Sequence, residues 1–491
     1  LIFNTKVLTN TRSTYREFRK WLFNETYVEK VYNFSILRKA PKNFGGQLFG
    51  SAVGPISIVF YKKEIPINNT DRIVYYAPKT FVKGNVLEGV SIDDTDVKFL
   101  PREICQNPDS KIWKIAMWGS LGDYNLIKRI TEKPNASIKT FIEKNQIKSG
   151  VGFQLLTQSK DKPYYSDVLG SLPYIDAEKI KRYYTKEENL ISIKSSIKSK
   201  KATSFYKKFY GVEHVSQIEK LSAFRRLGDM NAYNAPHIVV KKGLENNGVC
   251  ASLLENDCAF RDGVYGFYPQ SGNSNILKVL LAYLNSKFSS YFLFMTISSY
   301  GIEREQIMKN EYLSIPTKID SIQLDAIEKE INELLDDIAD KSFPNLHSYD
   351  SYFNEKIESV ISKSFEFNNK EISLINDAIK NSIDLFHNNN KSKAIFPVSD
   401  ITDYTKMLSN ELNDFLGGQN LFANATIFDI KRFSPLMAIK ISFEETQNKI
   451  VKSEEDINEE LSKLDKQLWE EKSTNIYFRK KLNYKVSNDV Y

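Results

Sequence analysis

The spacing of hydrophobic residues divides the chain into parts with different secondary structure. Near the N-terminus, apolar residues recur at helical spacing and predict a helix over residues 12–24. The apolar side of this helix contains Tyr15, Phe18, Trp21 and Leu22. Residues 28–34 and the nearly continuous apolar run 53–61 predict strands. Because a continuous apolar run is typical of a strand covered on both faces, we expect a sheet with two covering layers here.

The pattern changes twice further along the chain. Between residues 66 and 320, short mixed segments with many aromatic residues and glycine turns predict a mixed α+β region. This region includes an amphipathic helix that begins near residue 276, and the spacing buries Leu277, Leu280, Leu281, Leu284, Phe288 and Phe292 on one side. Residues 321–395 then read as a helical section with breaks at Pro344 and at 388–390. The polar side of its first helix is acidic, so we do not expect that side to lie on phosphate.

The last part, residues 396–491, reads as an α+β segment. We expect a strand at 437–443, a charged helix at 454–471 and a final strand at 476–480. A chain of 491 residues that is 41% hydrophobic is long enough for several packed domains.

Charge and cysteine content exclude a few kinds of protein but do not identify the partner. The net charge of +7 is modest, so a polyanionic partner fits only if the positive charge is concentrated on one face. Cys105, Cys250 and Cys258 are too few and too scattered for a disulfide framework or a four-ligand zinc site. We therefore expect Cys250 and Cys258 to be buried thiols and the protein to be cytoplasmic. No apolar run is long enough for a membrane span.

Residues 276–316 carry the most informative succession of motifs. The amphipathic helix ends in Asn285-Ser286-Lys287, followed by Gly301-Ile302-Glu303-Arg304 and by Leu313-Ser314-Ile315-Pro316. This succession resembles the C-terminal part of the target-recognition region in adenine-N6 DNA methyltransferases of the restriction-modification type. Taken alone, each element is ordinary globular sequence, and a scaffold helix followed by a loop is the competing interpretation.

The N-terminal residues carry a second resemblance to the same family. Residues 1–6 and the helix after them look like the strand and helix that follow the catalytic motif in these enzymes. The resemblance implies a multidomain α/β and α+β protein. Residues 1–65 would be the distal part of a doubly wound sheet that binds S-adenosylmethionine, and 66–320 a mixed α+β target-recognition region. A helical section (321–395) and an α+β C-terminal segment (396–491) would follow.

Two motifs that the family requires are missing. The family's Asn/Asp-Pro-Pro-Tyr/Phe element has Asn107-Pro108 as its nearest equivalent, without the second proline or the aromatic ring. A Gly-x-Gly-x-x-Gly loop is also absent, since the glycines of residues 45–50 are wrongly spaced. We expect both elements to lie upstream of Leu1 in a longer protein. This chain alone would then be inactive, with no S-adenosylmethionine site of its own.

One element of the base-binding pocket is present by resemblance. Residues 47–60 look like the family's loop and strand in which a phenylalanine packs on the extruded adenine, and Phe49 occupies that position. Flanking glycines permit close approach, and stacking on a base contributes ~1–3 kcal/mol. The competing interpretation is that Phe49 only covers the edge of the sheet.

Lysine and arginine residues are the candidate contacts to double-stranded DNA. Residues 179–208 contain ten of them, interleaved with aromatic residues, and the candidate phosphate contacts are Lys198, Lys200, Lys201, Lys207 and Lys208. The candidate base-reading residues are Arg225, Arg226, Arg261 and Arg304, because a planar guanidinium pairs with guanine. A solvated loop is the alternative for the lysines. For Arg304, a structural role at the Gly301 turn is the alternative that we favour.

Three functional hypotheses remain. The first is a site-specific adenine-N6 DNA methyltransferase to which this chain supplies mainly DNA target recognition, alone or with other subunits of a restriction or defence system. The second is a non-catalytic DNA-specificity subunit of a restriction-modification complex, which predicts two similar recognition halves that the sequence does not show. The third is a related protein that acts on RNA. His237 precedes an apolar strand and is interpreted as a core histidine, and we expect no metal site.

Overall fold

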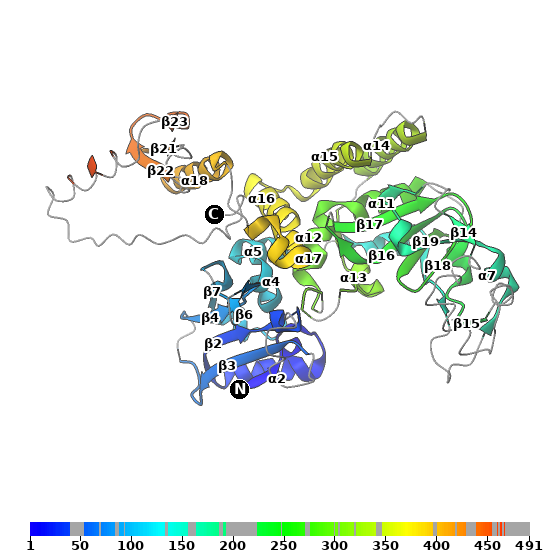
Figure 1. Ribbon diagram of the computed structural model, residues 1–491, viewed down its shortest axis with the longest axis horizontal. Helices are drawn as coiled ribbons and strands as arrows, with labels where there is room; N and C mark the ends of the chain where they lie inside the picture. The colour runs from blue at the N-terminus through cyan, green and yellow to red at the C-terminus, as the bar shows by residue number, and fades with distance from the viewer. Residues whose placement is uncertain are drawn as a thin grey trace.

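The chain folds into an N-terminal sheet unit, a central α+β region, a helical section and a small C-terminal unit (Figure 1). We call the central region the recognition region, after the role that the sequence predicts for it and that stays a prediction. The computed structural model describes residues 1–39, 54–67, 70–83, 88–92, 94–132, 136–155, 164–185, 190–192, 223–246, 248–270, 275–298, 300–302, 305–318, 321–339, 346–395, 400–417, 420–428, 438–453, 459, 462–463 and 466. Helices and strands occur together in most parts, which confirms a mixed α and β multidomain protein. No helix in these ranges is long and apolar enough to cross a membrane.

A five-stranded sheet forms the N-terminal unit. Its strands in spatial order are β1 (Ile2–Asn4), β3 (Ile56–Lys62), β2 (Tyr27–Asn33), β4 (Arg72–Tyr76) and β7 (Val97–Pro101). The β2–β4 pair is parallel, and the other three pairs are antiparallel. The helices of this unit are α1 (Lys6–Thr9), α2 (Ser13–Asn24), α3 (Arg102–Gln106), α4 (Ile112–Trp118) and α5 (Leu121–Glu132), and a separate hairpin consists of β5 (Thr80–Lys83) and β6 (Glu88–Ser91).

This sheet extends past the boundary that the sequence predicts near residue 65, because β4 and β7 belong to it. Three of its four strand pairs are antiparallel, whereas a doubly wound sheet is mostly parallel. The described strands by themselves therefore do not form a doubly wound sheet, and that architecture stays a prediction for a longer protein.

The N-terminal core lies on one face of the sheet. There, Phe23 of α2 stacks on Trp113 of α4 at 4.8 Å between ring centroids, and both side chains are buried. On the opposite face, Phe60 and Phe99 are 53% and 54% exposed. Among the described residues, the second covering layer that the apolar run 53–61 predicts is therefore absent at these positions. The run specifies a strand, but only its first half is buried.

The recognition region is built around another five-stranded sheet, in which β13 (Tyr183–Tyr184), β17 (Gly248–Leu254), β16 (His237–Glu245), β19 (Val264–Pro269) and β9 (Ile147–Val151) are neighbours in this order. Smaller sheets contain β10 (Gln154–Leu155), β15 (Ala223–Arg226) and β11 (Tyr164–Tyr165); β14 (Ile191–Ser192), β12 (Pro173–Ile175) and β18 (Ala259–Phe260); and β20 (Pro316–Thr317) with β8 (Ala136–Ser137). The helices are α6 (Ile138–Lys144), α7 (Asp167–Ser171), α11 (Asn275–Asn285), α12 (Lys287–Thr296) and α13 (Lys309–Leu313).

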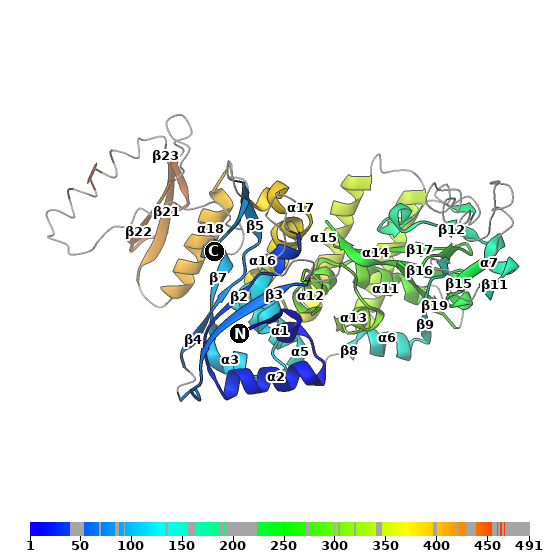
Figure 2. The same ribbon diagram turned by 60° about the horizontal axis from the view of Figure 1, so that its bottom comes forward.

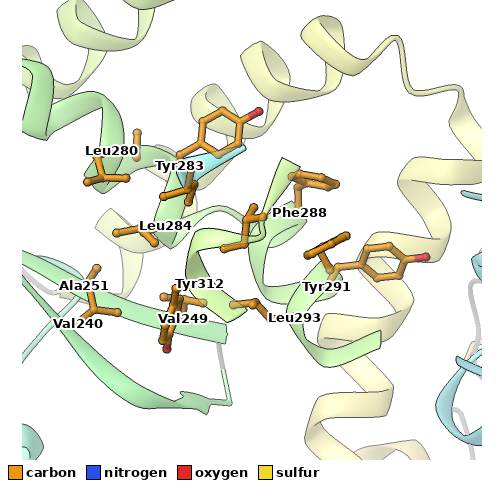
Figure 3. Close-up of a cluster of buried hydrophobic side chains, with 14 of the residues drawn as sticks. Val240, Val249, Ala251, Leu280, Tyr283, Leu284, Phe288, Tyr291, Leu293 and Tyr312 are labelled. Carbon is orange, nitrogen blue, oxygen red and sulfur yellow. The ribbon is translucent and has the colours of Figure 1, made fainter. Parts of the chain in front are cut away.

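Two consecutive helices cover this central sheet. Figure 3 shows Leu280 and Leu284 of α11, and Phe288 of α12, within a cluster that also contains Val249 and Ala251 of β17. These side chains are 5% exposed or less. The apolar spacing over residues 277–292 therefore predicts the core face correctly. The first helix ends at Asn285, as the sequence predicts, and Phe288 and Phe292 belong to the second helix.

The second half of the helical section, residues 369–388, lies between the two large units, and the first helix of the section packs on α11 of the recognition region (Figures 1 and 2). Its helices are α14 (Ser321–Ala339), α15 (Leu346–Phe365), α16 (Asn369–Asp377) and α17 (Ile383–Asn388). The C-terminal unit contains α18 (Thr402–Phe415), β21 (Phe422–Phe428), β22 (Ala438–Glu444) and β23 (Val451–Ser453). The predicted strand at 437–443 agrees with β22 within one residue. Most of the expected helix at 454–471 and all of the strand at 476–480 lie outside the described residues.

Candidate nucleic-acid interface

The three residues 285–287, which we call the Asn-Ser-Lys junction, hold the recognition region together. Asn285 ends α11 and is fully buried. Its Oδ1 accepts a hydrogen bond from the Ala251 N–H at 2.9 Å, and its Nδ2 donates to the Ala251 carbonyl at 2.9 Å. The side chain thus satisfies both backbone groups of one β17 residue, which would otherwise be costly to bury.

Ser286 begins the second helix. Its Oγ accepts a hydrogen bond from the Ser289 N–H at 3.0 Å, the contact of an N-terminal helix cap. One turn later, Ser290 Oγ accepts from the Val249 N–H at 2.9 Å. Close approach is possible because the neighbouring Gly248 has φ +98°, and a Cβ there would lie 2.1 Å from Ser290 Oγ.

Lys287 joins the junction to the helical section. Its N–H donates to the Glu358 carboxylate of α15, and its Nζ donates to Asn376 Oδ1 of α16 at 3.1 Å. Burial raises the pKa of Glu358 to about 7. All three residues of the motif therefore make internal contacts, and the scaffold interpretation describes the junction better than direct DNA contact does.

The loop after α12 connects the recognition region to the N-terminal unit. The hydroxyl of Tyr300 contacts the Leu244 backbone at 3.2 Å and 3.3 Å, and Tyr312 Oη donates to the Lys241 carbonyl at 2.6 Å. From the other side, Thr9 Oγ1 donates to the Ser298 carbonyl at 3.0 Å. This loop is thus fixed to the central sheet and to the first helices of the chain.

Among the predicted DNA contacts, Arg226 is the one whose neighbouring residues the structure describes most fully. It is exposed at the end of β15, and Gln154 of β10 lies opposite it in register. Gln154 Nε2 donates to Asp262 Oδ2 at 2.6 Å, so this carboxylate has a partner other than Arg226. The Arg226 side chain forms no hydrogen bond or ion pair with the residues that the structure describes.

Lys242 of β16 adds a second positive charge beside Arg226. Its Nζ lies 4.6 Å from the centre of the Tyr265 ring. Burial lowers the Lys242 pKa, and the nearby Arg226 charge lowers it further, while Asp262 raises it. We call Arg226, Lys242, Gln154 and Asp262 the Arg226 cluster. Two cations and one carboxylate leave it net positive, as a phosphate contact requires.

The other two predicted DNA-contacting arginines that the structure describes, Arg225 and Arg261, differ in position. Arg225 precedes Arg226 in β15, and successive strand residues point to opposite sides, so the pair does not share one face. Arg261 is exposed and is bridged through its backbone to Phe153, next to Gln154. The structure thus pairs Arg226 and Arg261 with two adjacent residues, Gln154 and Phe153.

The remaining predicted site residues lie outside the described residues, and their roles stay predictions. They are Phe49, Lys198, Lys200, Lys201, Lys207, Lys208 and Arg304. Lys242 was missed at the sequence level, since a lysine after an apolar strand gives no signal of its own. Its relevance comes only from its position beside Arg226.

Other polar candidates have structural roles. His237 is fully buried, its Nδ1 contacts the Asn234 carbonyl at 3.0 Å, and burial lowers its pKa to about 4. Cys250 and Cys258 are free and buried, as expected, and so is Cys105. Asn107-Pro108 forms a turn in which the Pro108 carbonyl accepts two hydrogen bonds from Arg19 of α2. Within the described ranges, no group of three metal-binding side chains occurs.

The chain matches no protein-family model and no curated protein sequence. Among solved structures, it is similar to the type IIG restriction endonuclease BpuSI, with 13% identity and a TM-score of 0.28 over 74% of this chain and 47% of that one. It is also similar to the type IIL restriction-modification enzyme MmeI in complex with DNA, with 11% identity and a TM-score of 0.37 over 76% and 48%. The HsdS subunit from Thermoanaerobacter tengcongensis has 8% identity and a TM-score of 0.19 over 74% and 96%.

The chain spans about half the length of the first two proteins. With TM-scores below 0.5, these similarities carry no inference about the fold or chemistry of this chain.

Proposed function

We propose that this chain belongs to a restriction-modification protein and supplies DNA target recognition to an adenine-N6 DNA methyltransferase. The main support is the strand–helix–strand unit formed by β1, α2 and β2. Both strands pair antiparallel with β3 between them, so β1 and β2 run in the same direction. Two parallel strands joined through a helix are the building block of a doubly wound sheet.

The edge of this sheet is consistent with a larger methyltransferase domain. Among the described strands, β1 pairs only with β3, so its other side is available to a further strand. Ile2 is 50% exposed at this edge. In the proposed protein, another segment would continue the sheet beyond β1.

The Arg226 cluster supports DNA as the partner. Guanidinium and ammonium groups bind phosphate or base edges. Arg226 lies in the small β10–β15–β11 sheet, and Lys242 lies in the central sheet, to which the Asn-Ser-Lys junction is hydrogen-bonded through β17. Methyl transfer to adenine N6 also requires the base to leave the duplex. We assign stacking on that base to Phe49, by resemblance alone.

S-adenosylmethionine is the implied methyl donor, but the described residues do not fit it. After β1 the chain enters helix α1 at Lys6 without a glycine-rich turn, the element on which a doubly wound fold usually holds its cofactor. No step of methyl transfer is therefore assigned to these residues.

Duplex binding as a function of salt tests the proposal. We expect the chain to bind a mixed-sequence duplex, with an affinity that falls steeply between about 50 mM and 200 mM salt as counterions are released. A flat response would contradict phosphate-led binding. Calorimetry with S-adenosylmethionine should show no micromolar binding to this chain, and such binding would contradict the missing cofactor site.

A variant at Phe49 tests whether the chain belongs to a methyltransferase or to a non-catalytic DNA-specificity subunit. In a methylating protein that contains this chain, Phe49→Ala should reduce methyl transfer far more than DNA affinity, because only the extruded base contacts the ring. Equal losses would indicate damage to the fold. Unchanged methylation would favour the specificity subunit.

A further inference from the structure

The side-chain amide of Gln154 has a defined orientation within the Arg226 cluster. Its Nε2 donates a hydrogen bond of 2.6 Å to Asp262 Oδ2. A carboxylate oxygen accepts hydrogen bonds, so the amide atom that faces it must be the nitrogen and not the oxygen. The contact with Asp262 therefore fixes both the position of the amide and which of its two ends faces away from the carboxylate.

The backbone around Asp262 is also held in place. The Asp262 N–H donates to the Phe153 carbonyl at 2.9 Å, and the Val264 N–H donates to the Arg261 carbonyl at 3.0 Å. These bonds close a tight turn over residues 261–264. A Cβ added to Gly263 in this turn would meet no atom within 4 Å, so the turn faces open space. The Gln154–Asp262 pair thus lies on a fixed backbone beside a turn that a large partner can approach.

One donor and one acceptor of the Gln154 amide remain available. The second N–H of Nε2 and the oxygen Oε1 form no hydrogen bond with the residues that the structure describes, and the side chain is half-buried. A donor next to an acceptor matches the major-groove edge of adenine, which has the N7 acceptor and the N6 amino donor. Guanine has two acceptors at this edge, so Gln154 Oε1 would face another acceptor there.

Two arginines beside this amide can bind the DNA backbone. Arg226 lies opposite Gln154 in register, and Arg261 is exposed and bridged through its backbone to the preceding residue, Phe153. Neither guanidinium forms a hydrogen bond or ion pair within the described part of the chain. Phosphate contacts set the position of a protein on the duplex, and base contacts add sequence preference. The cluster contains side chains for both kinds of contact.

We propose that Gln154 is a specificity-determining residue that recognises an adenine in the major groove, and that Asp262 is its positioning residue. This inference rests on the proposed function, because it requires duplex DNA as the partner. Gln154 Oε1 accepts from the adenine N6 amino group, and Nε2 donates to N7. Asp262 does not contact the base but holds the amide in this orientation. The recognised adenine stays paired in the duplex, unlike the extruded base.

Selection from a pool of duplexes with randomised positions tests the role of Gln154. The full chain is mixed with the pool, and the bound duplexes are sequenced. We expect adenine to be preferred over guanine at one position by about ten-fold or more. Gln154→Met keeps the length of the side chain but removes the amide, so it should abolish the preference at that position alone. Gln270→Ala, which removes an exposed amide of the same region, is the matched control and should keep every preference.

Two variants of Asp262 separate positioning from charge. Both Asp262→Ala and Asp262→Asn remove a negative charge, so both should strengthen binding to all sequences to a similar extent. Asp262→Asn keeps an oxygen that accepts from Gln154 Nε2 and should therefore keep most of the adenine preference. Asp262→Ala loses this contact and should reduce the preference by roughly three-fold or more. Equal preferences in the two variants would contradict the positioning role.

The outcomes distinguish this inference from the proposed function. If the chain retains no duplex, the proposed function is contradicted, and the role of Gln154 with it. If duplexes are retained without sequence preference, or with preferences that Gln154→Met leaves unchanged, the inference is wrong and the proposed function stands. A loss in Gln154→Met that is equal for all four bases, together with a lower melting temperature, would show that Gln154 only stabilises the fold.

Discussion

The Asn-Ser-Lys junction and the Arg226 cluster lie in the same region but use polar residues in opposite ways. In the junction, Asn285 and Ser286 are fully buried, and their side chains pair with backbone groups. In the cluster, Arg226 is exposed and has no hydrogen-bond or ion-pair partner in the described part of the chain. The recognisable sequence pattern thus belongs to residues that fix the scaffold, while Arg226, a predicted DNA contact, follows no pattern.

The largest effect that this comparison predicts is on stability at the junction. Asn285→Ala should lower the free energy of unfolding by about 3 kcal/mol, because the N–H and carbonyl of Ala251 both lose their partner. Denaturant unfolding measures the change. Gln306→Ala, which alters an exposed amide of the same region, should change stability by less than about 0.5 kcal/mol. Equal losses of unfolding free energy in Asn285→Ala and Gln306→Ala would show that the buried junction residue is no more important for stability than an exposed one.

A charged residue that is buried provides a second test. Burial lowers the pKa of Lys114 to about 7, whereas an unfolded lysine has a pKa near 10.5. Between these values the unfolded chain holds one more proton than the folded chain, so stability should rise with pH by up to ~1.4 kcal/mol per unit. Lys114→Met should lose this rise between pH 7 and 9 in phosphate-free buffer. An unchanged slope would mean that Lys114 is not the group responsible.

The Arg226 cluster should affect binding instead of stability. Arg226→Ala should weaken duplex binding by about ten-fold and lower the salt dependence by about one contact, because one phosphate partner is lost. Lys242→Ala should act in the same direction. Lys20→Ala, an exposed lysine of α2, is the matched control. A large loss of stability in Arg226→Ala would instead place this residue with the scaffold.

The smallest expected effect concerns the joint between the N-terminal unit and the helical section. Arg129 of α5 donates two hydrogen bonds of 2.8 Å to the two carboxylate oxygens of Glu371 in α16. Since the arginine side chain is 38% exposed, we expect a coupling of only about 0.5–1 kcal/mol in a double-mutant cycle with Arg129→Ala and Glu371→Ala. A coupling near zero would show that apolar packing alone holds this joint.

Local spacing predicted the elements better than their assembly. The helix expected over 12–24 is α2, Ser13–Asn24, and the strand expected over 28–34 is β2, Tyr27–Asn33. Both follow from side-chain periodicity within a few residues. The covering of the sheet could not be predicted in this way, and Phe60 is exposed although it ends a continuous apolar run. The predicted boundary near residue 65 failed for the same reason, because β4 joins the sheet from outside it.

The candidate site was predicted only in part. The sequence identified Arg226 and Arg261 as possible DNA contacts because of their chemistry, and it identified the core side of α11 because of its period. It did not indicate Lys242 or the buried Lys114. Each of these gains its environment from residues far away in the chain, such as Arg226 beside Lys242 and Gly301 beside Lys114.

The amino-acid sequence alone determined where most helices and strands form and which of their sides are apolar, because these preferences act between near neighbours. The tertiary structure decided which polar groups are buried and which remain free. Asn285 meets Ala251 across 34 positions of the chain, and Trp118 and Lys114 face a glycine more than 180 positions later. Such contacts depend on how the sheets and helices pack, which no local pattern of residues specifies.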